Sequence, residues 1–242
     1  MRGSIAQQAG YRDLLADLEH PGCPACRGSF RSARRYIGAV LWESVNDVGI
    51  RHRLRESQGF CGSHGQLAIK VAYERALATG MAVMYEDFLG HVERDLVVAV
   101  RRRRISAPVP ESRCPACERA DETTDSYLRI LGEAREGDEI FERARLSGRF
   151  VCLPHVRIGL GAVDGREQAG RLIDLFTLSS NRTRRDLQEF VRKHDYRFHD
   201  EPVSEAERSA WILAVEMLTG ESPTGSRGWI LERSGRSQFE GH

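Results

Sequence analysis

Apolar residues recur every three or four positions along most of this chain of 242 residues, which is the period of one face of an α-helix. Shorter runs predict helices over residues 5–19, from about residue 29 to residue 45, and from about residue 63. The clearest apolar face runs through residues 81–100 and consists of Met81, Met84, Tyr85, Phe88, Val92, Leu96 and Val100. The pattern predicts an all-α fold, a bundle of about nine or ten helices.

Polar residues, prolines and glycines mark where several of these helices begin or end. Asp47 is placed to cap a short helix that follows it. Ser204 and Glu207 have the spacing of a capping box and predict a final helix, which Gly220 ends. Two prolines within residues 106–111 indicate a linker near the middle of the chain.

The pattern of the first half returns 91 positions later in the second half. Tyr127 stands 91 positions after Tyr36, and Arg-Asp-Leu at 185–187 stands 91 positions after the same triplet at 94–96. Because the match holds at both ends of the unit, it predicts two tandem helical repeats that pack on each other. The expected ranges are a first repeat at 1–104, a linker at 105–113, a second repeat at 114–193, a C-terminal segment and helix at 194–220, and a disordered tail at 221–242.

All six cysteines fall into two repeated motifs, CPAC followed by CxxH. The motif residues are Cys23, Cys26, Cys61 and His64 in the first half and Cys114, Cys117, Cys152 and His155 in the second. Three thiolates and one imidazole form a Cys₃His set, which is typical of tetrahedral structural zinc. In each half, 34 residues separate the two pairs, enough for two helices. We therefore expect one zinc ion per repeat, two per chain, each joining the ends of a helical hairpin.

Other uses of these residues remain open from the sequence. Sulfur-rich sites also suit an iron–sulfur cluster, and the CxxC spacing occurs in dithiol redox proteins. Redox chemistry gives no role to the CxxH pairs, and four protein ligands leave no open position for catalysis by zinc. Crossed sites, in which the CPxC of one repeat joins the CxxH of the other, are an alternative to pairing within each repeat.

Charge and hydropathy narrow the class of protein. The chain has 36 basic and 35 acidic residues, a balance that argues against a dedicated nucleic-acid or membrane-surface binder. No apolar run approaches the 18 residues of a membrane-spanning helix, and the N-terminus lacks the apolar core of a secretory signal. We therefore expect a cytoplasmic protein, in which cysteines stay reduced and free to bind metal.

A polar and aromatic segment after the second repeat is the remaining candidate site. His194, Asp195, Tyr196 and Arg197 gather acid, base and hydrogen-bonding groups within residues 194–201. The alternative is a charged exit from a long helix. The chain has no common nucleotide-binding or hydrolase motif. We therefore predict a binding, adaptor or regulatory protein with an unknown protein or small-molecule partner. The alternatives are an iron–sulfur or redox-sensing protein and an enzyme with its site at 194–201.

Five motifs occur together in this chain: CPxC, LWESVND, GFCxxH, MYEDFL and VRKHDYRF. In this combination the chain resembles an uncharacterised bacterial family, the domain of unknown function numbered six thousand and sixty-two. The resemblance covers about residues 11–219. It implies no particular activity, but all eight predicted metal ligands fit the family pattern. The stretch from His194 to Phe198 matches the family's C-terminal motif.

Overall fold

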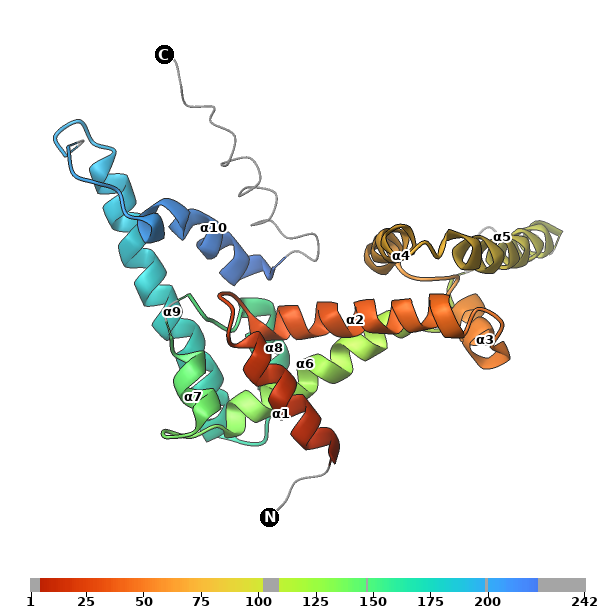
Figure 1. The fold of residues 1–242 in the computed structure, drawn as a ribbon, viewed down its shortest axis with the longest axis horizontal. Helices are drawn as coiled ribbons and strands as arrows, with labels where there is room; N and C mark the ends of the chain where they lie inside the picture. Colours follow the sequence, from red (N-terminus) through yellow and green to blue (C-terminus); the bar gives the residue numbers. More distant parts are fainter. Residues whose placement is uncertain (1–4, 102–108, 147, 199, 222–242) are drawn as a thin grey trace. The chain divides into compact units, whose positions relative to one another are not determined.

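The computed structural model describes residues 5–101, 109–146, 148–198 and 200–221, and every regular element in these ranges is an α-helix (Figure 1). The helices are α1 Ile5–Asp17, α2 Pro24–Glu43, α3 Val48–Glu56, α4 Gly62–Glu74, α5 Ala78–Arg101, α6 Pro115–Glu133, α7 Glu139–Ala144, α8 Leu153–Ala162, α9 Arg166–Lys193 and α10 Glu205–Thr219. The prediction of an all-α fold is therefore confirmed. Within the same ranges, no helix combines the length and apolarity needed to cross a lipid bilayer.

The chain forms two compact units that divide it differently from the ranges expected of the repeats. Unit 1 comprises residues 1–28 and 123–242, and unit 2 comprises residues 29–122. The unit boundaries fall inside α2 and α6, so each of these helices contributes residues to both units. Part of the expected linker, at 105–108, and almost all of the expected tail, at 222–242, lie outside the described residues.

Unit 1 has its own apolar core, and α9 is its longest helix. The largest fully buried side chains of this core are Tyr127, Phe150, Leu14, Leu18, Leu128, Leu131, Ile140 and Leu172. Helix α10 packs along α9 and also contacts α8. The predicted capping box at Ser204 and Glu207 opens α10, and Lys193 at the end of α9 pairs with the Glu207 carboxylate at 2.7 Å. In α2, Gly28 lies so close to Tyr127 that an added Cβ would be 2.5 Å from its ring.

Unit 2 is built around the first half of α5, against which α3 and α4 pack. Met84 and Phe88 of α5 are buried in the core, as the periodicity predicts. Leu96 and Val100, on the same predicted face, are 42% and 75% exposed. The continuous apolar face of α5 is therefore only half covered by its own unit, because α3 and α4 are shorter than α5.

Ion pairs join α3 to α5. The Asp87 carboxylate accepts hydrogen bonds from Arg55 Nε at 2.8 Å and pairs with Arg51 Nη2 at 2.9 Å. The hydrogen bond from Arg55, with a further contribution from Arg51, lowers the pKa of Asp87 from 3.8 to about 2. Asp47 caps α3 as predicted, since its carboxylate accepts from the backbone N–H of Ile50 at 2.8 Å.

Two tyrosines 91 positions apart have different surroundings. Tyr127 in unit 1 donates from its hydroxyl to Asp17 Oδ2 at 2.8 Å, and both residues are buried. Tyr36 in unit 2 has a buried hydroxyl with no hydrogen-bond partner among the described residues. Helix α1 supplies Asp17 to Tyr127, so the difference follows from which helix lies beside each tyrosine.

Candidate metal centres

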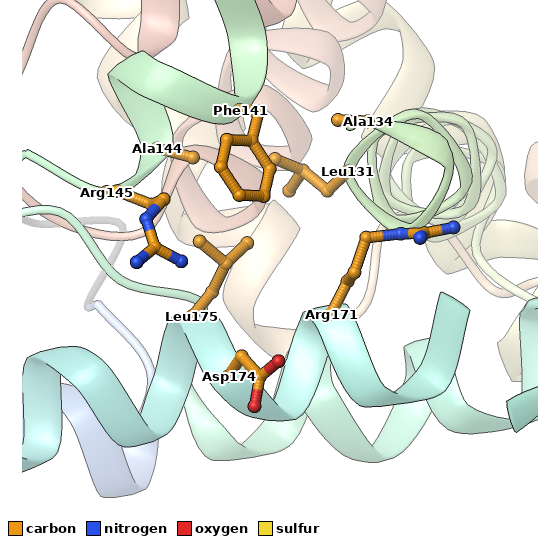
Figure 2. Close-up of a pocket in the computed structure, with 8 residues that line it drawn as sticks. All are labelled: Leu131, Ala134, Phe141, Ala144, Arg145, Arg171, Asp174 and Leu175. Atoms are coloured by element: carbon orange, nitrogen blue, oxygen red, sulfur yellow. The ribbon is translucent and has the colours of Figure 1, made fainter. Parts of the chain in front are cut away.

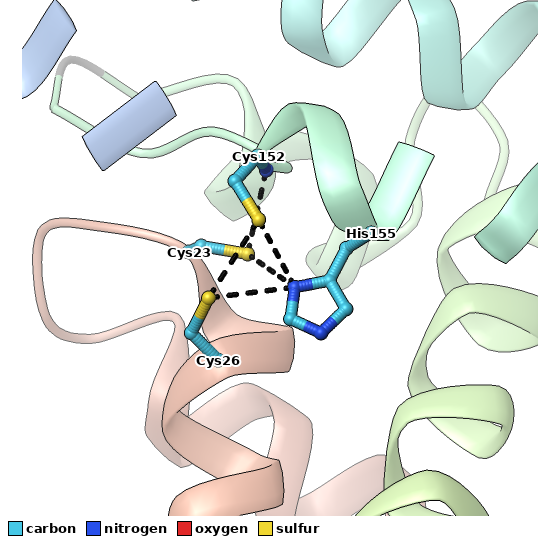
Figure 3. Close-up of side chains that lie close together, drawn as sticks. All are labelled: Cys23, Cys26, Cys152 and His155. Carbon is cyan, nitrogen blue, oxygen red and sulfur yellow. Dashed lines mark hydrogen bonds between the residues drawn. The ribbon is translucent and has the colours of Figure 1, made fainter. Parts of the chain in front are cut away.

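The eight Cys and His side chains converge in two groups of four. Site 1 consists of Cys23, Cys26, Cys152 and His155, and site 2 consists of Cys61, His64, Cys114 and Cys117. Within each group, one ligand atom from every residue lies within 4.8 Å of the others. Figure 3 shows the four side chains of site 1 pointing toward one another.

The expected pairing within each predicted repeat is wrong, and the structure has the crossed arrangement. The reason lies in backbone contacts between the loops that precede the ligands. At site 1, the Gly22 N–H donates to Gly148 O at 2.7 Å, and the Phe150 N–H donates to Gly22 O at 3.3 Å. At site 2, the Glu111 N–H donates to Glu56 O at 2.8 Å. These contacts hold each CPxC loop beside the CxxH loop of the other half of the sequence.

Every ligand lies at or near the start of a helix. Cys23 directly precedes α2, and Cys114 directly precedes α6. Cys61 and Cys152 are the N-cap residues of α4 and α8, and neither makes a side-chain capping bond. The positive end of a helix dipole stabilises a thiolate, so this placement favours the form of cysteine that binds metal.

The distances between ligand atoms fit a single tetrahedral ion. Zinc bonds of about 2.3 Å to sulfur and 2.0–2.1 Å to nitrogen imply separations of about 3.8 Å between sulfurs and 3.6 Å between sulfur and nitrogen. Cys26 and Cys152 Sγ are 3.6 Å apart, and Cys61 and Cys117 Sγ are 3.7 Å apart. The Nδ1 atom of the histidine lies 3.0–3.6 Å from the three sulfurs at site 1 and 3.3–3.7 Å from those at site 2. None of the six cysteines is in a disulfide.

Electrostatics at site 1 also favour a bound cation. Burial raises the pKa of Cys23, but hydrogen bonds from Cys152, Cys26 and His155 outweigh it and hold this pKa well below its usual value. Hydrogen bonds with Cys152 and Cys23 raise the pKa of Cys26, and the hydrogen bond with Cys23 is the main cause that raises the pKa of Cys152. Without a cation, one cysteine of the site ionises readily, and ionisation of the other two is unfavourable. A divalent ion would supply the positive charge that three thiolates need.

At site 2, too, the pKa of one cysteine is lowered and that of another is raised, although the ligands are less buried. At Cys114, burial raises the pKa, but hydrogen bonds from His64 and from backbone N–H groups outweigh it and lower the value to about 6. Burial and the hydrogen bond with Cys61 raise the pKa of Cys117 to about 12. Tyr85 lies near this site, where burial raises its pKa more than the hydrogen bond from the Phe60 N–H lowers it, and the nearby Cys114 and Cys61 add to the rise.

Two residues that contact site 1 belong to none of the predicted ligand motifs. Gly220 follows α10 with a φ of 85°, and Glu221 comes next. The Glu221 carboxylate accepts a hydrogen bond from the backbone N–H of Cys23, and its own N–H donates to Cys26 Sγ at 3.3 Å. The glycine indicated where the helix would end, but no motif places the next residue beside a metal site.

The polar segment after α9 is paired internally in the structure. His194 Nδ1 lies 2.7 Å from Phe190 O, and its ring packs on the Phe190 ring at 4.2 Å between centroids. Arg197 pairs with Asp195 at 2.7 Å, and Tyr196 is 81% exposed. These contacts resemble a charged helix exit more than a convergent site. His199, in the same segment, lies outside the described residues.

A cavity of about 80 Å³ in unit 1 lies between α6, α7 and α9 (Figure 2). Its walls are Leu131, Ala134, Phe141, Ala144, Arg145, Arg171, Asp174 and Leu175. Arg171 is held by Gly132 O at 2.6 Å and Glu167 at 2.7 Å, and Arg145 lies over the Phe141 ring at 5.0 Å. None of the residues that line this cavity is among the metal ligands or site residues predicted from the sequence.

Comparisons with known proteins place the chain among uncharacterised relatives. An uncharacterized 23.9 kDa protein from the xynA 3′ region of Caldicellulosiruptor sp. (strain Rt8B.4) is 23% identical over 207 residues, which cover 86% of this chain and 99% of that protein. No solved structure matches the chain. The model of a family of unknown function, DUF6062, matches residues 103–225, about half of the chain, including four candidate ligands and Glu221. The chain therefore belongs to the DUF6062 family.

Proposed function

We propose that this protein is a zinc-binding helical protein in which two structural Cys₃His sites each hold one zinc ion. The observation that carries the proposal is the convergence of all six cysteines and two histidines into two groups with tetrahedral spacing. Four protein ligands per group leave no coordination position for a substrate, which favours a structural over a catalytic role.

The spacing also favours one ion per site over an iron–sulfur cluster. Every ligand atom lies within 4.8 Å of the others in its group. A cluster of several irons with bridging sulfides would fill the space between its cysteines and hold them further apart. A dithiol redox role would leave the histidine of each group without a function.

We further propose that the chain arose as two tandem repeats whose ligand pairs are exchanged. Three pairs of helices support this, because α6, α7 and α8 begin 91 positions after α2, α3 and α4. Each zinc would then join ligands from both halves of the sequence. Losing either ion would affect both repeats.

The role that these features support best is binding of a partner, as an adaptor or regulatory protein in the cytoplasm. Exposed apolar side chains on α4 and α5 support such a role, among them Tyr73 at 89% and Leu89 at 62% exposure. Groups of exposed apolar side chains are typical of surfaces that bind other molecules. The partner is a protein or small molecule that remains to be identified.

Elemental analysis of paired variants tests both the metal and the crossed pairing. The intact protein is expected to be colourless and to carry two zinc ions. The variant Cys23→Ser with Cys152→Ser removes ligands from site 1 alone and should keep one zinc. The variant Cys23→Ser with Cys61→Ser damages both sites and should keep none.

The opposite results would identify errors in the proposal. If pairing within repeats holds in solution, the Cys23 and Cys61 variant keeps one zinc and the Cys23 and Cys152 variant loses both. A brown protein containing iron and inorganic sulfide would show that the sites hold an iron–sulfur cluster instead of zinc. An intact protein that binds no metal would refute the proposed function altogether.

A further inference from the structure

The two candidate metal sites differ in how deeply they are buried. At site 1, Cys23 and Cys152 are both 0% exposed, while Cys26 and His155 are partly exposed. At site 2, only Cys114 is buried, at 7%, and the other three ligands are partly exposed. The ligand chemistry is the same at both sites, so the difference in burial comes from what surrounds them.

The C-terminal end of α10 covers site 1. An added Cβ on Gly220 would lie 3.6 Å from Cys26 Sγ and 3.8 Å from Cys152 Sγ, so the backbone passes directly over two sulfurs. With a φ of 85°, Gly220 has a backbone conformation that other residues rarely adopt. Glycine therefore allows the chain to turn from α10 onto the site.

Glu221 then fixes this turn with contacts at both ends of the CPAC loop. Its carboxylate accepts from the Cys23 N–H, and its own N–H donates to Cys26 Sγ at 3.3 Å. Arg27 lies 4.0 Å from the carboxylate and balances part of its charge. An N–H donor to a thiolate offsets negative charge on the sulfur, and such contacts around the ligands tune metal affinity.

We propose that Gly220 and Glu221 are positioning residues that close site 1, so that site 1 exchanges zinc more slowly than site 2. This inference rests on the proposed zinc sites. The closing segment keeps water and competing ligands from the sulfurs of Cys26 and Cys152. Among the described residues, site 2 has no acidic side chain in an equivalent position on its CPAC loop, and its zinc is the more accessible ion.

Metal release coupled to cysteine labelling tests the inference on the full chain without changing a ligand. Zinc content is measured first, and the zinc-loaded protein is then mixed with a chelator and N-ethylmaleimide. Mass spectrometry follows the labelling of each cysteine over time. In the wild type, Cys61, Cys114 and Cys117 should be labelled before Cys23, Cys26 and Cys152.

The variant Glu221→Ala should speed labelling of the site 1 cysteines by about 10–100-fold, the usual effect of losing an outer contact to a metal ligand. Labelling at site 2 should not change. Glu221→Gln keeps an oxygen that can accept from the Cys23 N–H and should stay close to wild type. The control Glu205→Ala removes an exposed carboxylate at the other end of α10 and should have no effect.

Two outcomes would overturn the inference while leaving the zinc sites intact. One is a protein with two zinc ions whose site 1 and site 2 cysteines are labelled at equal rates. The other is a Glu221→Ala variant that binds two zinc ions and labels like the wild type. A protein without zinc would instead show that the proposed function is wrong.

Discussion

Replacing Tyr127 with Phe tests the packing of unit 1 against a control within the same chain. The change removes the hydroxyl that donates to Asp17 Oδ2 at 2.8 Å. Tyr127 is 1% exposed and Asp17 is 2% exposed, so water does not readily replace the lost bond. The matched control is Tyr36→Phe, because the hydroxyl of Tyr36 is buried without a partner among the described residues.

The two substitutions remove the same hydroxyl group, but their effects on the free energy of unfolding should differ in sign or size. A hydrogen bond to a charged group contributes about 1.5–3 kcal/mol, and Tyr127→Phe should lower the free energy of unfolding by that amount. At about 2–4 °C per kcal/mol, Tm should fall by about 3–12 °C. Tyr36→Phe removes an unsatisfied hydroxyl and should range from neutral to a gain of about 1 kcal/mol.

Urea unfolding of the variants, followed by far-ultraviolet circular dichroism, gives the comparison. Metal content must match that of the wild type, so that any loss of metal does not contribute to the difference. Equal destabilisation by the two substitutions would refute the reasoning, because the hydroxyl environments would then be alike. A larger cost for Tyr36→Phe would do the same.

Two further predictions concern the helices of each unit. Gly28→Ala should lower the free energy of unfolding by about 1–3 kcal/mol, because it forces a methyl group against the Tyr127 ring. The control Gly90→Ala in α5, where an added Cβ would lie 3.7 Å from its nearest neighbour, should raise it by about 0.5–1 kcal/mol. Equal effects of the two substitutions in thermal unfolding would contradict the close contact at Gly28. Asp87→Asn should cost about 1 kcal/mol because its ion pairs with α3 are lost. The pKa of Asp87 in the folded protein, about 2, lies below the ordinary value of 3.8, so the carboxylate stabilises the fold at every pH above 3.8. The cost of the substitution should therefore be the same at pH 7 and pH 5 and shrink only below pH 3.8. A cost that already falls between pH 7 and pH 5 would contradict the lowered pKa.

The sequence predicted the elements of this fold well because each helix carries its own local signals. Apolar periodicity gave the helices, and Asp47 and Ser204 cap α3 and α10 as their positions indicate. The extent of the core was harder to predict. Leu96 and Val100 continue the periodic face of α5, but periodicity does not show where the helices that cover it end.

The pairing of the metal ligands could not be predicted for a different reason. The CPxC and CxxH spacings are the same in both halves, so pairing within a half and crossed pairing satisfy the same local rules. The choice depends on backbone contacts between loops far apart in the sequence, such as Gly22 with Gly148. Glu221 presents the same difficulty, because its role depends only on where α10 brings it.

The crossed pairing has a consequence for how the chain folds during synthesis. Cys23 and Cys26 leave the ribosome first, and Cys61 with His64 soon follow, so the first complete Cys₃His set is the one that the folded protein does not use. His155 emerges 91 residues after His64, which takes about 5–20 s at 5–20 residues per second. A metal ion captured in that interval would hold a non-native hairpin, and the nascent chain would have to exchange thiolates on the ion before its final topology could form.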